Sequence, residues 1–541
     1  MRYAGGRRRR VPLKPLLVFC GVFVTGLGLL MLQLKSLDFE FRASNNGSSS
    51  KDMAAASWRA ADTTVKKPCL TVEEMGKDFR RGVGKESLRV RTIIQKHFVA
   101  NGASRVRDLP PEQFCSHGFV LGKTSEAGFG NEMYKVLTAA ALSVMLNRSL
   151  IIGQTRGKYP FGDYISYSNF TFTMKEIKHL WRSNGCESKY GRKLVIRTDD
   201  FEKPVETNVL CSNWIKWKQP IIWFQGTTDS VAAQFFLKNI HSRMRIAALD
   251  LFGDPQVLGL RPNVFGELMR VLISPSEDVE AAVNWVIGGG KIPDISLHMR
   301  MLMNRSVRAV QAALHCIKKA IRSHHLISSR PRVVLVSDTP SLVKSIKSNI
   351  SEFAEVLHFD YEKFRGSIFK GLQNSNFRRK DWGTAPRWVA FVDFFLASRA
   401  RYATVSGAHR RVGTTYAQLI AALAATYNLG DNSSSSGFLF LSSFQSNLLK
   451  DGLKNQIGWG HVWNRYGGPL SCHNQGNQCA FTPVLPSAWW EGLWQSPIPR
   501  DINRLASYGI RLSGLGTVDN NSLQNHCKKR KNVVRTITLK L

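Results

Sequence analysis

The feature that most limits what this chain can fold into is an alternation of apolar strands and helices between residues 291 and 428. Short runs rich in β-branched residues alternate with longer stretches whose apolar residues recur at helical spacing. This alternation predicts an α/β fold, a parallel sheet covered by helices. The predicted strands are Ile295–Arg300, Val333–Asp338, Val356–Phe359 and Tyr402–Val405, and the predicted helices are Val307–Ile321, Ser341–Ser348, Arg387–Ala400 and Tyr416–Thr426.

Polar side chains stand at the ends of these predicted strands, the edge at which open parallel sheets bind ligands. They are His298, Arg300, Ser337, Asp338 and Ser406. The last strand continues through a polar, glycine-bearing turn, Ser406–Thr415, into a helix. A helix N-terminus offers unpaired N–H groups and the positive end of the helix dipole. The turn is therefore suited to holding phosphates.

A second strand–turn–helix unit lies earlier in the chain. Gly128 and Gly130 in its loop would let a ligand approach the backbone closely, although glycines end strands for structural reasons more often. A length of 541 residues suggests two domains with appendages. We predict domains at residues 114–290 and 291–428. The elements of the early unit are strand Phe119–Leu121, loop Gly122–Glu132, helix Met133–Leu146 and strand Leu150–Ile152.

The N-terminus predicts a membrane anchor. A cluster of arginines ends at Arg10, and the uncharged stretch Leu16–Leu34 follows it. About 19 residues nearly span a hydrocarbon core of roughly 30 Å. Because arginines stay on the cytoplasmic side, we expect residues 1–15 to be a cytoplasmic tail and the chain after Lys35 to be lumenal. A cleaved signal peptide is the alternative, but the apolar run is long and lacks a small-residue cleavage pattern.

Two further regions flank the predicted domains. Residues 35–113 are mixed and polar, which favours a stem that holds the domains away from the bilayer. Residues 429–541 form a Trp/Gly-rich extension that we expect to pack against the domains, without an assigned chemistry.

Cysteines and glycosylation sequons are compatible with a lumenal location. Eight cysteines follow the predicted anchor, an even number that suits disulfides. Cys472 and Cys479 flank a short polar loop and are the pair we expect to be bonded; zinc binding is the weaker alternative. Chance alone gives some Asn-x-Ser/Thr sites, so these only permit a lumenal fate. They are Asn46, Asn147, Asn169, Asn304, Asn349, Asn432 and Asn520.

The formal net charge is +36. Nucleic acid is disfavoured as a partner because the positive residues are spread along the chain without a basic aromatic repeat or finger motif. A lumenal domain also meets no genome. The charge suits a sugar nucleotide, an acidic glycan or an anionic membrane face. A solvated basic surface without a partner is the alternative.

Individual residues suggest how a nucleotide sugar is held. Arg300 could pair with a diphosphate, with His298 on the same face of the strand; a structural ion pair is the alternative for Arg300. Ser337 and Asp338 could accept a ribose or cap the next helix. Asp393 lies in an apolar helix and needs a partner, either a guanine edge or an internal Arg or Lys. The chain has no Asp-x-Asp, so we expect no metal bridge to the diphosphate.

At these residues the chain resembles the GDP-fucose-dependent fucosyltransferase superfamily, which includes protein O-fucosyltransferases, α1,6-fucosyltransferases and plant O-fucosyltransferase-like proteins. The resemblance runs from about Phe114 to Ala425. It is carried by Gly128–Glu132 with Leu146–Ile152, by the His-x-Arg strand His298–Arg300, and by Asp393–Ala400 with Gly413–Tyr416.

The resemblance implies a GT-B-like fold of two facing Rossmann-like domains, with the acceptor on the first and GDP-fucose on the second. It implies metal-independent, inverting transfer of fucose. Our favoured hypothesis is a Golgi membrane enzyme that acts on a glycan or a secreted protein and needs no cofactor. The family roles fall on Arg300 for the β-phosphate, on Asp393 for guanine, and on Thr414, Thr415 and Tyr416 for the phosphates and fucose. We add His298 as a catalytic candidate and take as further donor-binding candidates Gly128, Gly130, Asn131, Ser337, Asp338 and Ser406.

The chain departs from the family pattern after the His-x-Arg strand, where Met301–Asn304 replace an expected acidic residue. Glu126 and Glu132 are the carboxylates near the first loop, and neither is assigned as the general base that an acceptor hydroxyl needs. Two alternatives therefore stay open. One is a GT-B transferase with another nucleotide sugar, and the other is a catalytically silent fucosyltransferase-like binding protein.

Overall fold

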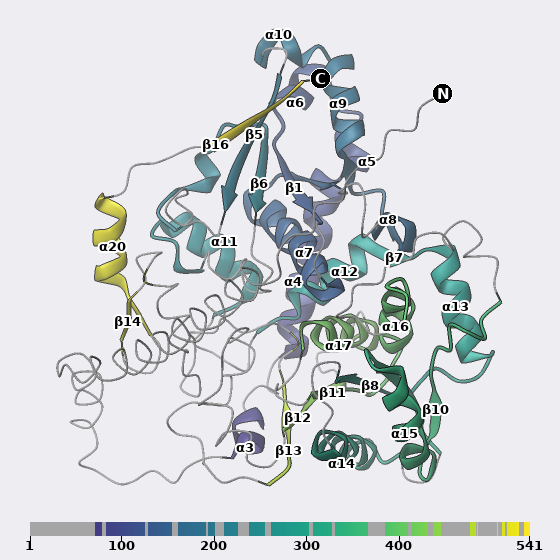
Figure 1. The fold of residues 1–541 in the computed structure, drawn as a ribbon. Helices are drawn as coiled ribbons and strands as arrows, with labels where there is room; N and C mark the ends of the chain where they lie inside the picture. Colours follow the sequence, from purple (N-terminus) through teal and green to yellow (C-terminus); the bar gives the residue numbers. More distant parts are fainter. Residues whose placement is uncertain are drawn as a thin grey trace, which may run out of the picture. The chain divides into compact units, whose positions relative to one another are not determined.

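The computed structural model places two α/β lobes after residue 70 (Figure 1). Both are built on six-stranded sheets. The residues that the structure describes are 71–77, 83–124, 128–153, 161–190, 193–200, 210–225, 237–254, 261–301, 307–326, 330–365, 385–408, 414–430, 437–444, 476–482, 484, 506, 511–513, 517–529 and 535–540.

The first sheet has the strand order β16-β5-β6-β1-β2-β4. Five strands run parallel, and the C-terminal strand β16 adds to the edge antiparallel to β5. Side chains alternate between its two faces: Val120 and Ile222 face one hydrophobic core, and Phe119 and Ile221 face another. The strands are β1 (Phe119–Lys123), β2 (Ser149–Gly153), β4 (Phe172–Thr173), β5 (Lys193–Asp200), β6 (Ile221–Gln225) and β16 (Arg535–Lys540).

The second sheet has the strand order β10-β9-β8-β11-β12-β13, in which β13 alone is antiparallel to its neighbour. From β8 the chain moves outward through β9 to β10, then crosses back to the other side of β8 with β11 and β12. The strands are β8 (Ile295–Arg300), β9 (Arg332–Ser337), β10 (Glu355–Leu357), β11 (Ala403–Ala408), β12 (Leu439–Phe444) and β13 (Gln478–Phe481).

The connecting elements form where apolar residues recur at helical spacing and end at polar caps or glycines. The helices are α3 (Val72–Lys77), α4 (Val83–Asn101), α5 (Ala103–Val106), α6 (Pro111–Ser116), α7 (Phe129–Leu146), α8 (Phe161–Tyr164), α9 (Met174–Ser183), α10 (Cys186–Tyr190), η2 (Trp214–Lys216), α11 (Ser242–Phe252), α12 (Val264–Leu272), α13 (Glu277–Ile287), α14 (Val307–Ser323), α15 (Pro340–Ser351), α16 (Val389–Ala397), α17 (Thr415–Asn428) and α20 (Asn520–Lys529). Two small sheets pair β3 (Ile165–Tyr167) with β7 (Ile273–Pro275) and β14 (Arg511–Ser513) with β15 (Thr517–Asp519).

One hydrophobic core joins the two lobes. It contains residues of α7, which packs on the first sheet, of α12, which packs on α7 and α17, and of α16 and α17, which pack on the second sheet. The far face of the second sheet packs on α14 and α15 in a core of its own. Asn263 donates from the start of α12 to the carbonyl oxygen of Ala422 in α17, at 2.7 Å. The helices that face the joint core therefore belong to both lobes.

These observations confirm the predicted α/β class with two Rossmann-like lobes, a GT-B-like fold. The predicted anchor, residues 16–34, lies outside the described residues. Within the described part of the chain, we find no helix that combines the length and apolar character needed to cross a bilayer. Helix α4, inside the predicted stem, contributes Val90, Ile94 and Phe98 to the joint core. The predicted extension supplies β12 and β13 to the second sheet and β16 to the first.

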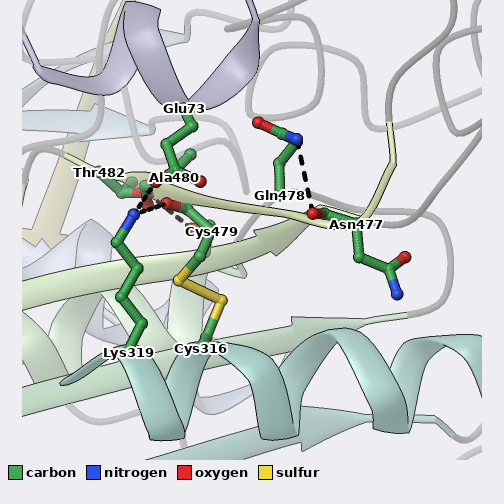
Figure 2. The surroundings of a disulfide bond; sticks show 9 residues. Glu73, Cys316, Lys319, Asn477, Gln478, Cys479, Ala480 and Thr482 are labelled. Carbon is green, nitrogen blue, oxygen red and sulfur yellow. Dashed lines mark hydrogen bonds and ion pairs between the residues drawn. A yellow bond between two sulfur atoms is a disulfide. The ribbon is translucent and has the colours of Figure 1, made fainter. Parts of the chain in front are cut away.

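Three disulfides connect described cysteines, and they correct one prediction. We expected Cys472 to bond Cys479, which is wrong because Cys479 bonds Cys316 (Figure 2). The pairing of β13 with β12 brings Cys479 over α14, where Cys316 lies with its Cα atom 5.4 Å away. Beside this disulfide, Lys319 forms an ion pair with Glu73 of α3. The other bonds are Cys115–Cys186 and Cys211–Cys527.

Candidate functional site

The order of the second sheet marks where a ligand would bind. Its connections go to one side after β8 and to the other side after β11, so these neighbouring strands flank a topological switch point. Open parallel sheets bind ligands outside the carboxyl ends of the strands at such a point. Ser406 lies beside His298, and Ala408 beside Arg300, in the register of β11 and β8. The predicted strand-end residues His298, Arg300 and Ser406 thus come together at this switch point.

His298 connects the switch point to the start of α17. Its side chain is buried, its Nδ1 atom lies 3.3 Å from the Thr414 hydroxyl, and its ring centroid lies 5.0 Å from that of Tyr416. Thr414 is the N-cap of α17, and its hydroxyl oxygen accepts the Ala417 N–H at 3.1 Å. Burial, followed by the nearby charge of Arg300, lowers the pKa of His298 to about 3. At neutral pH this imidazole is therefore uncharged and positions Thr414.

The N-terminus of α7 in the first lobe meets the N-terminus of α17 in the second. A β-carbon on Gly130 would lie 2.9 Å from Thr415 Oγ1 and 3.1 Å from the backbone nitrogen of Tyr416. The Thr415 hydroxyl donates to Asn131 Oδ1 at 3.5 Å. Gly128 is the N-cap of α7. Each helix brings the partial positive charge of its N-terminus to the same place, which favours an anion there.

Aromatic rings pack around this contact. Phe129 of α7 lies with its ring centroid 4.8 Å from Phe394, 5.1 Å from Phe391 and 5.3 Å from Tyr416. The Tyr416 hydroxyl donates to the carbonyl oxygen of Ala390 in α16. The predicted residue Tyr416 therefore joins three helices in this structure, and the rings hold the two helix N-termini in place.

Asp393 is buried in α16, one turn after Ala390, with 6% of its surface exposed. Its Oδ1 atom has no hydrogen-bond partner among the residues with described positions, and burial raises the pKa of the carboxyl well above its ordinary value. We considered two partners for Asp393, a guanine edge or an internal Arg or Lys. The described residues supply no Arg or Lys to it. The carboxyl group keeps its hydrogen-bonding capacity for another donor.

Arg300 ends β8 with an exposed side chain. Within the described ranges it forms no salt bridge, which was the structural alternative for this residue. Among the described contacts, Thr414 is touched by His298 and not by Arg300.

Ser337 and Asp338 fasten the ends of β8 and β9 together. The Ser337 hydroxyl donates to the carbonyl oxygen of Met299 at 2.8 Å, and Asp338 Oδ1 accepts the Met301 N–H at 2.7 Å. Neither residue caps the next helix, because the N-cap of α15 is Thr339, whose own N–H donates to Ser337 Oγ. Their observed bonds are structural, and the ribose contact stays a prediction.

Gln418 is a site candidate that sequence reasoning missed. It lies one turn after Thr414 on the same side of α17, is fully buried, and neither amide atom has a hydrogen-bond partner among the described residues. Ser406 Oγ is likewise buried without a partner. Buried amides normally find partners. An amide among the apolar residues Ala417, Leu419 and Ile420 was the available signal in the sequence.

Carboxylates near the first loop give no clear base. Glu132 is fully buried in α7, and its Oε1 atom forms an ion pair with Lys135 Nζ at 3.1 Å. Glu126 lies outside the described residues. Among the residues whose positions are described, no group of three or more His, Cys, Asp or Glu side chains could hold a metal ion.

Comparison with known proteins gives a family and distant structural relatives. The sequence model of a family of unknown function (DUF7810) matches residues 64–539. No protein with curated annotation matches the chain.

The structure is similar to those of GDP-fucose fucosyltransferases, which confirms the predicted resemblance. An Arabidopsis thaliana FUT1 mutant in complex with GDP is 12% identical, with 65% of this chain and 78% of that chain covered and a TM-score of 0.37. Fucosyltransferase NodZ from Bradyrhizobium is 13% identical, with coverages of 56% and 92% and a TM-score of 0.31. POFUT1 in complex with GDP-fucose is 10% identical, with coverages of 60% and 98% and a TM-score of 0.33.

Proposed function

The chain belongs to the DUF7810 family, and we propose that it is a glycosyltransferase that transfers fucose from GDP-fucose to a glycan or protein acceptor. The observation that carries this proposal is the meeting of the α7 and α17 N-termini, through Gly130 and Thr415, beside the switch point of the second sheet. A diphosphate is the chemical group that two converging helix dipoles suit best.

The same place supplies the remaining charges for a nucleotide diphosphate. Arg300 ends the neighbouring strand without a salt bridge among the described residues, and its guanidinium can pair with phosphate oxygens. Asp393 offers a buried carboxyl acceptor, which suits the N–H donors of a guanine edge. GDP and GDP-fucose are named with the structures of FUT1 and POFUT1, and this supports guanosine and fucose as the donor's parts.

The proposed reaction is direct displacement at the anomeric carbon. An acceptor hydroxyl attacks that carbon while its bond to the β-phosphate oxygen breaks, so the configuration inverts and GDP leaves with the electron pair. Arg300 and the α17 N–H groups offset the charge that develops on the diphosphate. These cationic groups take the part that an Asp-x-Asp-bound metal plays elsewhere, since the sequence has no such motif. The acceptor proton passes to a base that we leave unassigned.

For the location we propose a Golgi membrane protein with a single anchor at residues 16–34 and both lobes in the lumen. The arginine cluster before an uncharged stretch supports this orientation. The three disulfides agree with an oxidising compartment. Protease treatment of intact and of opened vesicles tests the orientation, because lumenal lobes are digested only after the vesicles are opened.

The function is tested with the full-length chain in detergent. We expect GDP to raise the unfolding temperature and GDP-fucose with a glycan or protein acceptor to release GDP. Arg300→Ala should lower turnover by about 100-fold, the usual effect of losing one group that stabilises developing charge. Arg308→Ala, an exposed arginine at the start of α14, is the matched control and should leave turnover unchanged. Absence of both stabilisation by GDP and turnover would reject the proposal.

A binding protein without turnover is the second candidate. It is favoured by the buried ion pair of Glu132 with Lys135, which leaves no assigned base near the first loop. GDP would then stabilise the fold, Arg300→Ala would remove that stabilisation, and no nucleotide sugar would be consumed. If the donor is another nucleotide sugar, uridine diphosphate or adenosine diphosphate should raise the unfolding temperature in place of GDP.

A further inference from the structure

We propose that Asn169 carries an N-linked glycan. The inference rests on the lumenal orientation proposed above and is independent of nucleotide-sugar chemistry at the interlobe site. Such sequons are modified on surface loops of secreted chains. Four sequons begin at described residues, and they differ in their surroundings: Asn147, Asn169, Asn349 and Asn520.

Asn169 lies in an exposed turn between β3 and β4. The turn is closed by Thr171, whose N–H donates to the carbonyl oxygen of Ser168 at 3.2 Å and whose hydroxyl donates to the same oxygen at 3.1 Å. The Asn169 side-chain amide makes no hydrogen bond to the described residues. A glycan attached to its Nδ2 atom therefore breaks no contact that the fold uses.

The residue between Asn169 and Thr171 holds this turn against the first lobe. The Phe170 ring lies 6.2 Å from that of Phe98 in α4, and the Phe170 carbonyl oxygen accepts the Ala103 N–H at 2.9 Å. Phe170 packs on the joint core while Asn169 is exposed. The fold thus presents the acceptor asparagine from a fixed turn.

In the sequon at Asn147, the fold engages the asparagine side chain and buries the serine. Asn147 Oδ1 accepts a hydrogen bond from Asn101 Nδ2 at 2.7 Å. Ser149 is fully buried, and its hydroxyl donates to the Asn101 carbonyl oxygen at 2.6 Å and lies 2.8 Å from His117 Nε2. The hydroxyl that a transferring enzyme must recognise is therefore inaccessible in the folded chain.

The remaining two described sequons are helical. Asn349 and Ser351 lie in α15, and Asn520 and Ser522 lie in the first turn of α20. Residues two apart on a helix point to different sides, so amide and hydroxyl are not presented together. Asn169 is the described sequon that combines an exposed turn with a side chain free of hydrogen bonds to the described residues. Its Thr171 is largely buried, at 9% exposed, against 0% for Ser149 in the sequon of Asn147.

The modification is a transfer from a polyprenyl-diphosphate-linked oligosaccharide. The bond between the anomeric carbon and the diphosphate oxygen breaks, and a bond forms between that carbon and Asn169 Nδ2. The amide nitrogen loses one proton to the transferring enzyme's base, and the polyprenyl diphosphate leaves with the electron pair. No oxidant or reductant takes part.

The test expresses the full chain in cells with a secretory pathway and compares its mass before and after peptide N-glycosidase treatment, with glycopeptide mapping. We expect Asn169→Gln and Thr171→Ala each to lose one glycan. Thr171→Ser, which preserves the sequon and the hydroxyl, should keep it. Asn147→Gln and Asn349→Gln are the matched controls and should leave the mass of the attached glycans unchanged.

An unmodified Asn169 in the folded wild-type chain would overturn the inference, as would loss of the glycan only in Asn147→Gln. The outcome is separable from that of the proposed function. A chain glycosylated at Asn169 that neither binds GDP nor releases it would reject the transferase proposal alone. A chain that turns over GDP-fucose with a bare Asn169 would reject this inference alone.

Discussion

Asp393 is a buried carboxylic acid, and no described cation lies against it. Burial raises its pKa well above the ordinary value, so the folded chain binds a proton more tightly than the unfolded chain does. The free energy of unfolding therefore falls as pH rises from the unfolded pKa toward the folded one. A residue that costs stability at neutral pH and lies beside the proposed nucleotide site is a strong candidate for ligand binding.

Asp393→Asn should separate these two effects. The amide carries no charge, so the variant should be at least as stable as the wild type at neutral pH and should lose the decline of stability toward high pH. It should also weaken GDP binding by about tenfold or more, because a charge-assisted hydrogen bond is lost. Urea unfolding from pH 4 to 8 and titration with GDP measure both. Equal GDP affinity in the two proteins would remove Asp393 from the guanine site.

Gly130 shows why the first lobe needs a glycine where it meets α17. A β-carbon there would press against the Thr415 hydroxyl at 2.9 Å and the Tyr416 backbone nitrogen at 3.1 Å, and the backbone of a helix N-terminus cannot move aside easily. We expect Gly130→Ala to cost about 1 to 3 kcal/mol of stability, the usual range for overpacking. It should also weaken GDP binding, because it forces the two helix N-termini apart.

Urea unfolding and GDP titration measure this variant. The matched control is Gly476→Ala, because a β-carbon at Gly476 would meet no atom within 4 Å. Its effect on stability should stay within about 0.5 kcal/mol, as for other surface substitutions. A Gly130→Ala protein with unchanged stability and affinity would show that the contact between the helices is not tight.

At the scale of elements, the junction of α4, α6 and β2 buries basic groups, and none of their described contacts is to a carboxylate. His117 Nε2 donates to Ser149 Oγ at 2.8 Å, and Arg148 donates to the Trp217 and Gln219 carbonyl oxygens. Burial, and then the charge of Arg148, lowers the pKa of His117 to about 4. Burial also lowers the pKa of His97 to about 4, with a smaller contribution from His117. Both histidines are neutral in the folded chain near pH 7.

We predict that this junction makes the fold sensitive to acid. Between pH 6.5 and about 4 the unfolded histidines bind protons that the folded ones do not, so stability is full above this window and falls as pH falls through it. The total loss should be about 2 to 4 kcal/mol, less than the full shift because the site can admit water. His117→Gln keeps a donor for Ser149 and should flatten the curve, as followed by urea unfolding. An unchanged curve would assign the acid sensitivity elsewhere.

For the whole molecule, local patterns in the sequence predicted both lobes because each strand and helix there carries its own periodicity. The predicted strand Ile295–Arg300 and helix Val307–Ile321 agree with β8 and α14 to within two residues. Strand β5 was missed because Arg197 and Asp199 interrupt its apolar run. These two residues are buried as an ion pair at 2.8 Å, with Arg197 stacked on the Trp217 ring, which no local pattern shows.

The part of the candidate site that lies at strand ends could be predicted from the sequence. His298 and Ser406 come together because parallel register places neighbouring carboxyl ends side by side. The contact of Gly130 with Thr415 joins residues almost 300 positions apart and depends on how the lobes pack. The bond of Cys316 to Cys479 likewise depends on β13 joining the second sheet, so spacing along the chain favoured the wrong partner.

Strand β16 forms one edge of the first sheet and contributes to the stability of the first lobe. Six residues of β16 pair with β5, and Ile537 and Leu539 pack on the core beneath the first sheet while Thr536 and Thr538 are exposed. We predict that Ile537→Ser with Leu539→Ser lowers stability by about 2 kcal/mol, since both side chains are only partly buried. The matched pair Thr536→Ala with Thr538→Ala, on the opposite face of the same strand, should change it by less than about 0.5 kcal/mol. Equal effects of the two double variants in urea unfolding would mean that β16 contributes through its backbone ladder alone.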